Sequence, residues 1–315
     1  MIAIAPTTES NSREQDFLDW FSLDFQGKGL ESKFQFGATA HYCVSFSEVF
    51  QGKEIAGHGY DADQSAATLK AAAELMERRS VVEYFLRNSG EPLHNSNGWA
   101  VHFSVAAATE AAKREAMERH LLLYTYLLSG WSEFVCVDRR KSKNGEALFL
   151  ASPYTQDQYF SGIVIYRDNR FSGVSFGYLA DHISKICSSP RWNHALFEAI
   201  GFVERGVETG GFSRATENSI YNGCREWLTA SWDEPLWKTE LQWKNLHSVS
   251  PRIQAGRASD LVPCYEGLHF SRVEPGKLIP LFLKEDLLDP ARKKFIAGIL
   301  DRYGLVLPHG RTPIL

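Results

Sequence analysis

The stretch that decides the fold of this chain is residues 71 to 78, Ala-Ala-Ala-Glu-Leu-Met-Glu-Arg, together with a second copy at residues 111 to 119, Ala-Ala-Lys-Arg-Glu-Ala-Met-Glu-Arg. Both copies end in the pattern Glu-x-x-Glu-Arg, and both contain the alanine that favours a helix. At helical pitch, positions i, i+3 and i+4 share one face, so each copy places two carboxylates beside one guanidinium. We therefore expect two long helices with similar acidic faces.

The chemistry of these two faces depends on whether they meet. A single copy is typical of a solvated helix face held by ion pairs between neighbouring turns. Two copies with matching alanine flanks favour a second interpretation, in which both faces border one cleft. Such a cleft would offer the hard oxygen ligands that Mg²⁺ prefers and the forked N–H groups that bind phosphate.

Composition excludes several other classes of protein. The 315 residues are 44% hydrophobic and 23% charged with a net charge of −4, which is typical of a globular protein and not of a nucleic-acid-binding one. The cysteines are scattered without a Cys-x-x-Cys pair, which argues against a disulfide framework and a structural zinc site. No secretory signal or membrane-length apolar run is present, so we expect a cytoplasmic protein without a membrane partner.

The periodicity of apolar residues predicts an α+β fold with long helices packed on mixed or antiparallel sheets. Residues 1 to 14 are expected to be flexible, and residues 15 to 315 to form a single catalytic domain. The run Ile163-Val-Ile165 predicts a strand buried on both faces. The expected helices are 16–25, 62–86, 105–128, 191–209, 219–232 and 289–302. The expected strands are 34–50, 134–138, 147–151, 159–166, 171–178, 269–273 and 279–282.

Three further motifs have both a structural and a functional interpretation. Gly57-x-Gly59 before a helix predicts a tight turn, although such a turn can also cradle phosphate at the helix N-terminus. Ser96-Asn97-Gly98 is a common turn in which Asn97 could place an amide near a ligand. Glu198 interrupts an apolar helix face, and a carboxylate there needs a partner or a metal ion.

The order of these motifs resembles the YcaO family. The resemblance rests on residues 57 to 78, on residues 96 to 119 and on Ala195-Leu-Phe-Glu198-Ala, with weaker support from residues 273 to 281 and the proline-containing tail. It runs from about residue 50 to the C-terminus. It implies a YcaO-type ATP-binding fold with the nucleotide held in a cleft between long helices. The metal ligands that it implies for Mg²⁺ are Glu74, Glu77, Glu115, Glu118 and Glu198. The residues that it implies for ATP are Lys70, Glu74, Arg78, Asn97, Glu115 and Arg119.

The resemblance also implies a reaction. Members of the family phosphorylate the oxygen of a peptide backbone amide with ATP, after a nucleophile has added to the carbonyl. Side chains of Cys, Ser or Thr give azolines, which is the activity expected here, whereas sulfide gives a thioamide and a backbone amine gives an amidine. A catalytically silent scaffold that recruits a peptide is the alternative from another class.

The implied partners are a ribosomally made precursor peptide and a separate protein that binds its leader, because no peptide-binding domain is recognisable before residue 50. A flavin-dependent dehydrogenase and a second copy of the chain are further partners to consider.

The sequence departs from the family pattern at three places. Lys70 stands where many members have Ser, and Gly201 stands where many have Gln. The tail ends in Thr312-Pro313-Ile314-Leu315 instead of alternating prolines. We expect residues 307 to 315 to pack toward the Glu/Arg cleft, with Pro313 and the carboxylate of Leu315 contributing to catalysis. The alternative is an ordinary exposed terminus.

Overall fold

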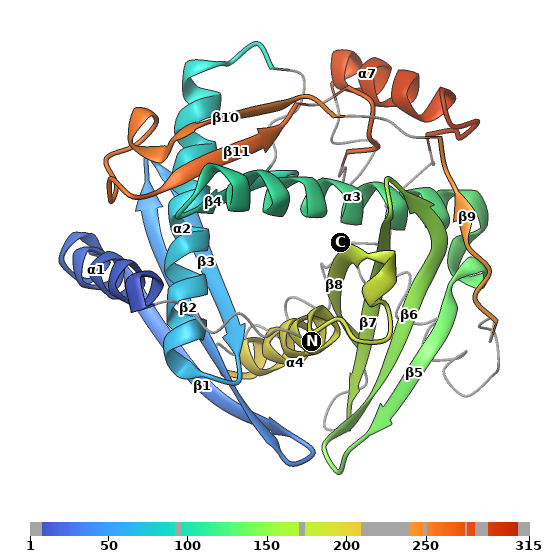
Figure 1. Ribbon diagram of the computed structural model, residues 1–315, viewed down its shortest axis with the longest axis horizontal. Helices are drawn as coiled ribbons and strands as arrows, with labels where there is room; N and C mark the ends of the chain where they lie inside the picture. The colour runs from blue at the N-terminus through green and yellow to red at the C-terminus, as the bar shows by residue number, and fades with distance from the viewer. Residues whose placement is uncertain are drawn as a thin grey trace.

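A computed structural model describes residues 8–91, 96–169, 174–208, 240–247, 251–274, 276–280 and 289–307. Three sheets, antiparallel except for one short parallel strand, pack with three long helices, which confirms the α+β class (Figure 1). These helices are α2 (Gln64–Arg87), α3 (Val105–Ser129) and α4 (Arg191–Glu208). Each lies within two residues of its expected bounds. No helix in the described ranges combines the length and the apolarity that a membrane crossing requires.

The first sheet comes from the N-terminal part of the chain and packs against α2 (Figure 1). Its strands are β1 (Lys28–Phe36), β2 (Thr39–Phe50) and β3 (Lys53–Asp61), in that order. The single strand expected over 34–50 is therefore a hairpin, because Gly37 turns the chain at a φ of +64°. The helix α1 (Thr8–Asp24) precedes this sheet and begins at Thr8 instead of the expected Asp16, so residues 8 to 14 are helical.

The tight turn expected at Gly57-x-Gly59 is wrong, since both glycines lie inside strand β3. Their role is close packing. A Cβ on Gly59 would stand 1.8 Å from the carbonyl oxygen of Ala67, and one on Gly57 would stand 2.2 Å from that of Ala71. The glycines thus let strand β3 lie directly on the backbone of α2, which holds the first acidic helix face at a fixed distance from the sheet.

The largest sheet has the order β5 (Val135–Lys141), β6 (Gly145–Gln156), β7 (Tyr159–Asp168) and β8 (Val174–His182). A short strand, β9 (Lys244–Asn245), runs parallel to β6. In β7, Val164 packs in the cluster that includes α4, while Ile163 and Ile165 pack in the cluster that includes Leu122 of α3. The expected burial of this strand on both faces is confirmed.

The third sheet joins distant parts of the chain. Its order is β10 (Ile253–Arg257), β11 (His269–Val273) and β4 (Trp99–His102).

The helix α7 (Pro290–Asp301) begins after Asp289, whose carboxylate caps its first N–H groups. Ile279 and Pro280 do not form the expected strand. The predicted helix 219–232 lies outside the described residues. The short 3-10 helices are η1 (Gly130–Glu133), η2 (Ile183–Lys185) and η3 (Ala258–Asp260).

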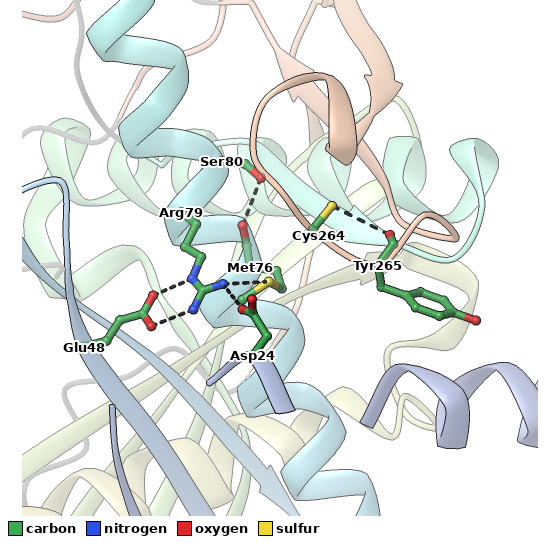
Figure 2. A network of polar contacts seen from close by, with 7 residues as sticks. All are labelled: Asp24, Glu48, Met76, Arg79, Ser80, Cys264 and Tyr265. Atoms are coloured by element: carbon green, nitrogen blue, oxygen red, sulfur yellow. Dashed lines mark hydrogen bonds and ion pairs between the residues drawn. The ribbon is translucent and has the colours of Figure 1, made fainter. Parts of the chain in front are cut away.

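A buried ion-pair network at Arg79 ties α1, β2 and α2 together (Figure 2). The Arg79 guanidinium donates to both carboxylate oxygens of Glu48, at 2.5 and 2.6 Å, and to Asp24 at 2.6 Å. Its side chain is 9% exposed, so these bonds are shielded from water. Arg79 therefore faces the sheet, which leaves the neighbouring Arg78 on a different side of α2.

Candidate functional site

Carboxylates from both Glu-x-x-Glu-Arg motifs line one cavity. This cavity has a volume of about 760 Å³ and is bordered by α2, α3, β4 and the start of α4. Glu74 and Glu77 line it from α2, and Glu115 lines it from α3. The charge of Glu115 acts on both Glu77 and Arg78 across the gap between the helices. Three of the five carboxylates expected at one site thus border this cavity, whereas Glu118 and Glu198 are not among its lining residues.

Glu74 and Arg78 form the most ordered part of the first motif. Arg78 donates to Glu74 at 2.8 Å, and the other oxygen of Glu74 accepts the backbone N–H of His58 at 2.8 Å. Arg78 also donates to the hydroxyl of Ser96, in the turn before β4. Burial opposes the charge of Arg78, but the Glu74 and Glu77 carboxylates outweigh it and raise the pKa of this guanidinium. Arg78 is thus a permanently charged group fixed beside Glu74, whose side chain lines the cavity.

Glu77 and Glu115 differ from Glu74 because neither accepts a hydrogen bond in the described part of the chain. Burial raises the pKa of Glu77 well above its ordinary value, and the neighbouring Glu115 and Glu74 carboxylates raise it further. Burial likewise raises the pKa of Glu115 to about 7, although Arg119 and Arg78 oppose the shift. Two carboxyl groups with unused acceptor oxygens therefore face each other across the cavity.

The second motif continues away from the cavity toward Tyr178 of β8. The guanidinium of Arg119 lies 4.9 Å from the centre of the Tyr178 ring, and it stands 3.4 Å from Glu118. Its Nε and Nη1 atoms are buried without a hydrogen-bond acceptor among the described residues. Burial raises the pKa of Glu118 above its ordinary value, although Arg119 opposes that shift. Arg119 therefore has N–H groups left for a ligand.

Glu198 reaches the same region from α4. One of its carboxylate oxygens accepts the backbone N–H of Tyr178 at 3.0 Å. Burial raises its pKa to about 7, while this hydrogen bond opposes the shift and the Glu118 carboxylate adds to it. The backbone N–H of Tyr178 is thus the partner that a carboxylate on an apolar helix face needs, and the charge of Glu118 reaches Glu198 as well.

The remaining residues that were predicted for the site are Lys70, Asn97, Pro313 and Leu315. Lys70 lines the cavity but is already paired with Asp61 at 2.5 Å. Asn97 is half-buried in the turn before β4, next to Gly98 with its φ of +70°, and it does not line the cavity. Pro313 and Leu315 lie outside the described residues, so the role of the tail stays a prediction.

Several lining residues were missed from the sequence. Arg191, Asn193 and His194 border the cavity from the first turn of α4. A signal for Arg191 was available, because it precedes Glu198 by seven residues and shares its helix face. No pattern in the sequence indicates Tyr178, because only the pairing of β8 within the sheet places this residue beside Arg119.

No protein-family model and no curated protein matches this chain. Among solved structures, it is similar to YcaO from Methanopyrus kandleri bound with AMPPCP and Mg²⁺, with a TM-score of 0.43 and 14% identity over 61% of this chain and 68% of that one. It is also similar to a heterocyclase in complex with substrate and cofactor, with a TM-score of 0.49 and 11% identity over 95% of this chain and 56% of that one.

A third similar structure is the E. coli microcin synthetase McbBCD complex, with a TM-score of 0.45 and 10% identity over 77% of this chain and 86% of the matched one.

Proposed function

We propose that this protein uses Mg²⁺ and ATP to activate peptide backbone amides by phosphorylating the amide oxygen. The observation that carries the proposal is that carboxylates of both Glu-x-x-Glu-Arg motifs line one cavity, with Glu74 and Glu77 on α2 and Glu115 on α3, while Arg119 of the second motif has buried N–H groups without an acceptor among the described residues. Carboxylates suit Mg²⁺, and guanidinium groups suit phosphate. The site therefore offers negative groups for a metal ion and positive groups for a phosphate.

The donor set fits Mg²⁺ better than a metal that needs a complete protein cage. Among the described residues, no three His, Cys, Asp or Glu side chains are close enough to hold a metal ion by themselves. Mg²⁺ in nucleotide sites is normally held by one or two carboxylates, by water and by phosphate oxygens. Glu77 and Glu115 are the first candidates to hold it, because both line the cavity with unused oxygens. Glu74, Glu118 and Glu198 are the neighbouring candidates.

Arg78 and Arg119 are the proposed phosphate ligands of this site. The bound nucleotide would supply the phosphoryl group that turns an amide oxygen into a good leaving group. The protein's own contribution is to position the charged groups and to neutralise them in a region shielded from water. The pKa values of about 7 at Glu115 and Glu198 mean that both can ionise near neutral pH at little cost when a cation arrives.

The most specific form of the proposal is cyclodehydration of Cys, Ser or Thr to azolines in a ribosomally made peptide. A leader-binding protein would present that peptide, and a flavin-dependent dehydrogenase would act on the ring afterwards. Formation of a thioamide or an amidine uses the same activation step and differs only in the nucleophile.

Nucleotide binding and peptide mass together test the proposal. We expect ATP to bind in the presence of Mg²⁺ and far more weakly in EDTA. With the precursor peptide and its leader-binding partner present, we expect phosphate release and the loss of water from the peptide. A protein that recruits the peptide but binds no nucleotide would be the scaffold instead. Nucleotide-dependent incorporation of sulfur would identify the thioamide reaction.

A further inference from the structure

A second cavity lies apart from the acidic cavity of the proposed site. It has a volume of about 740 Å³ and lies where α3, β9 and the end of α7 come together (Figure 1). Its lining shares no residue with that of the acidic cavity, and the proposed function uses none of it. The lining residues that matter here are Tyr124, Asn245, Leu246, Lys277, Arg302 and Tyr303.

Two tyrosine rings form one corner of this second cavity. The ring centres of Tyr124 and Tyr303 are 5.9 Å apart, and the two planes meet at 72°. Tyr124 also meets the ring of Tyr154 edge-on, with the centres 4.8 Å apart. The hydroxyl of Tyr303 donates to the backbone carbonyl of Lys277 at 2.7 Å. Because both rings are fixed by such contacts, the corner is a preformed aromatic surface on which an apolar side chain can pack.

Two cations stand beside the tyrosine corner. Lys277 and Arg302 are exposed, and neither has an ion pair within the described part of the chain. Arg302 donates to the backbone carbonyl of Gly276 at 2.6 Å, which anchors it to the residue before Lys277. By contrast, Lys244 on β9 is paired with Glu133 at 3.3 Å. No Asp or Glu is among the lining residues, so this cavity presents positive charge in a chain whose net charge is −4.

The second cavity is also bordered by a strand edge that no other described strand covers. Strand β9 pairs with β6 in parallel, and the N–H of Leu246 donates to the carbonyl of Thr155 at 2.8 Å. Successive residues of a strand direct their backbone groups to opposite sides, so the N–H and C=O of Asn245 point away from β6. These outward groups form a short edge to which an extended peptide can add.

We propose that the second cavity binds an acidic peptide segment in an extended conformation. The peptide backbone adds to the outer edge of β9 at Asn245, while its carboxylates meet Lys277 and Arg302. Apolar side chains of the same segment pack against the tyrosine corner. The strand edge favours a peptide over a small anion, because only a peptide offers main-chain groups at strand spacing. The identity of this peptide rests on the proposed function, which makes it a segment of the precursor peptide.

The position of the second cavity on α3 indicates which part of the precursor binds there. Glu115 borders the acidic cavity, and Tyr124, which borders the second one, follows it by nine positions. Nine residues span about 14 Å along a helix and place two side chains on opposite faces. A peptide that reaches both cavities must therefore pass around α3, which takes at least about five extended residues. The docked segment is thus remote in sequence from the residues that are modified.

Fluorescence anisotropy without nucleotide tests the docking site. The probe is a labelled synthetic peptide in which glutamate alternates with phenylalanine, and its counterpart carries lysine in place of glutamate. We expect the wild type to bind the acidic probe at least about tenfold more tightly, because the two cations repel lysine. Lys277→Glu should weaken the acidic probe about tenfold or more. The matched control, Lys294→Glu, reverses an exposed charge on α7 outside the cavity and should change the affinity less than about twofold.

A pair of substitutions at Asn245 tests the strand edge. Asn245→Ala removes the side chain and keeps the outward backbone N–H, whereas Asn245→Pro removes both. The N–H of Leu246, which bonds to β6, is present in both variants. We expect Asn245→Pro to bind the acidic probe about fivefold more weakly than Asn245→Ala. Melting temperatures check that both variants fold, and if Asn245→Pro does not fold, the Lys277→Glu comparison decides.

The outcomes separate this inference from the proposed function. Equal affinity of the acidic probe for the wild type, Lys277→Glu and Asn245→Pro would overturn the docking site, as would a wild type that does not bind the probe. Displacement of the probe by the precursor peptide supports the assignment, and a precursor that leaves the probe bound would overturn this choice of occupant. Because the assay contains no nucleotide, a protein that binds the probe but no ATP would keep the docking site and lose the proposed function.

Discussion

At the scale of single residues, the acidic side chains of the site were predictable and their surroundings were not. Helical pitch alone places Glu74 with Glu77, and Glu115 with Glu118, on common faces. The hydrogen bond from the backbone of Tyr178 to Glu198 joins β8 to α4, and no local pattern encodes such a contact.

Removing the charge at the carboxylates should abolish activity and keep the fold. We expect Glu77→Gln and Glu118→Gln each to lower turnover by about 100-fold or more, because an amide oxygen is a far weaker ligand for Mg²⁺ than a carboxylate. The measurement is phosphate release with peptide and partner present. Glu83→Gln, which alters the ion pair with Arg87 on the same helix, should retain activity. Full turnover in both site variants would contradict the assignment.

His41 should make the protein sensitive to acid. This side chain is buried against Phe34 and Phe197, and burial lowers its pKa to about 4 despite the opposing charge of Asp61. The unfolded chain takes up the proton near pH 6.5, so stability is lost as the pH falls from about 6.5 toward 4. Between these two pH values, the unfolding free energy of the wild type should fall by about 1 to 3 kcal/mol more than that of His41→Gln.

Denaturant unfolding at several pH values measures this effect. The exposed His247 gives the matched control, because His247→Gln should leave the pH dependence as it is in the wild type. The explanation is wrong if His41→Gln and the wild type lose stability in parallel on acidification.

At the scale of the elements, long helices were predictable to within two residues, whereas strands that depend on distant partners were not. Strand β4 has only four residues and pairs with β11, about 170 positions along the chain. The error at Gly57-x-Gly59 has a different origin. A glycine pair before a helix is typical of a turn, and it is equally typical of a strand that packs on a helix backbone, so the local sequence does not distinguish them.

The close approach of β3 to α2 makes Gly59 a sensitive position. We expect Gly59→Ala to destabilise the protein by about 3 kcal/mol or more, because the new Cβ would stand 1.8 Å from the carbonyl oxygen of Ala67. Gly298→Ala on α7 is the control. Among the described residues, no atom beyond its own stretch of helix lies within 4 Å of the new Cβ, and a helical alanine should add up to about 1 kcal/mol of stability. Thermal unfolding compares the two, and equal melting temperatures would refute the packing argument.

At the scale of the whole molecule, the cavity is where all three long helices and the third sheet meet. Its walls come from residues as far apart as Thr39 and Phe197, so no local segment can form it alone. The sequence could indicate the two acidic faces and their chemistry. It could not give the distance between them, because that distance is set by the packing of α2 on the first sheet and of α3 on the largest one.

A ligand held by walls from distant segments should stabilise the molecule as a whole. A ligand that binds only the folded state adds about 2.7 kcal/mol at a free concentration 100 times its Kd. We expect ATP with Mg²⁺ to raise the melting temperature by a few degrees, and ATP with EDTA to raise it much less, because the carboxylates repel bare phosphates. Differential scanning fluorimetry measures the shift. The variant that combines Glu77→Gln and Glu118→Gln should lose the Mg²⁺-dependent part. An equal shift with and without Mg²⁺ would mean that the nucleotide binds away from these carboxylates.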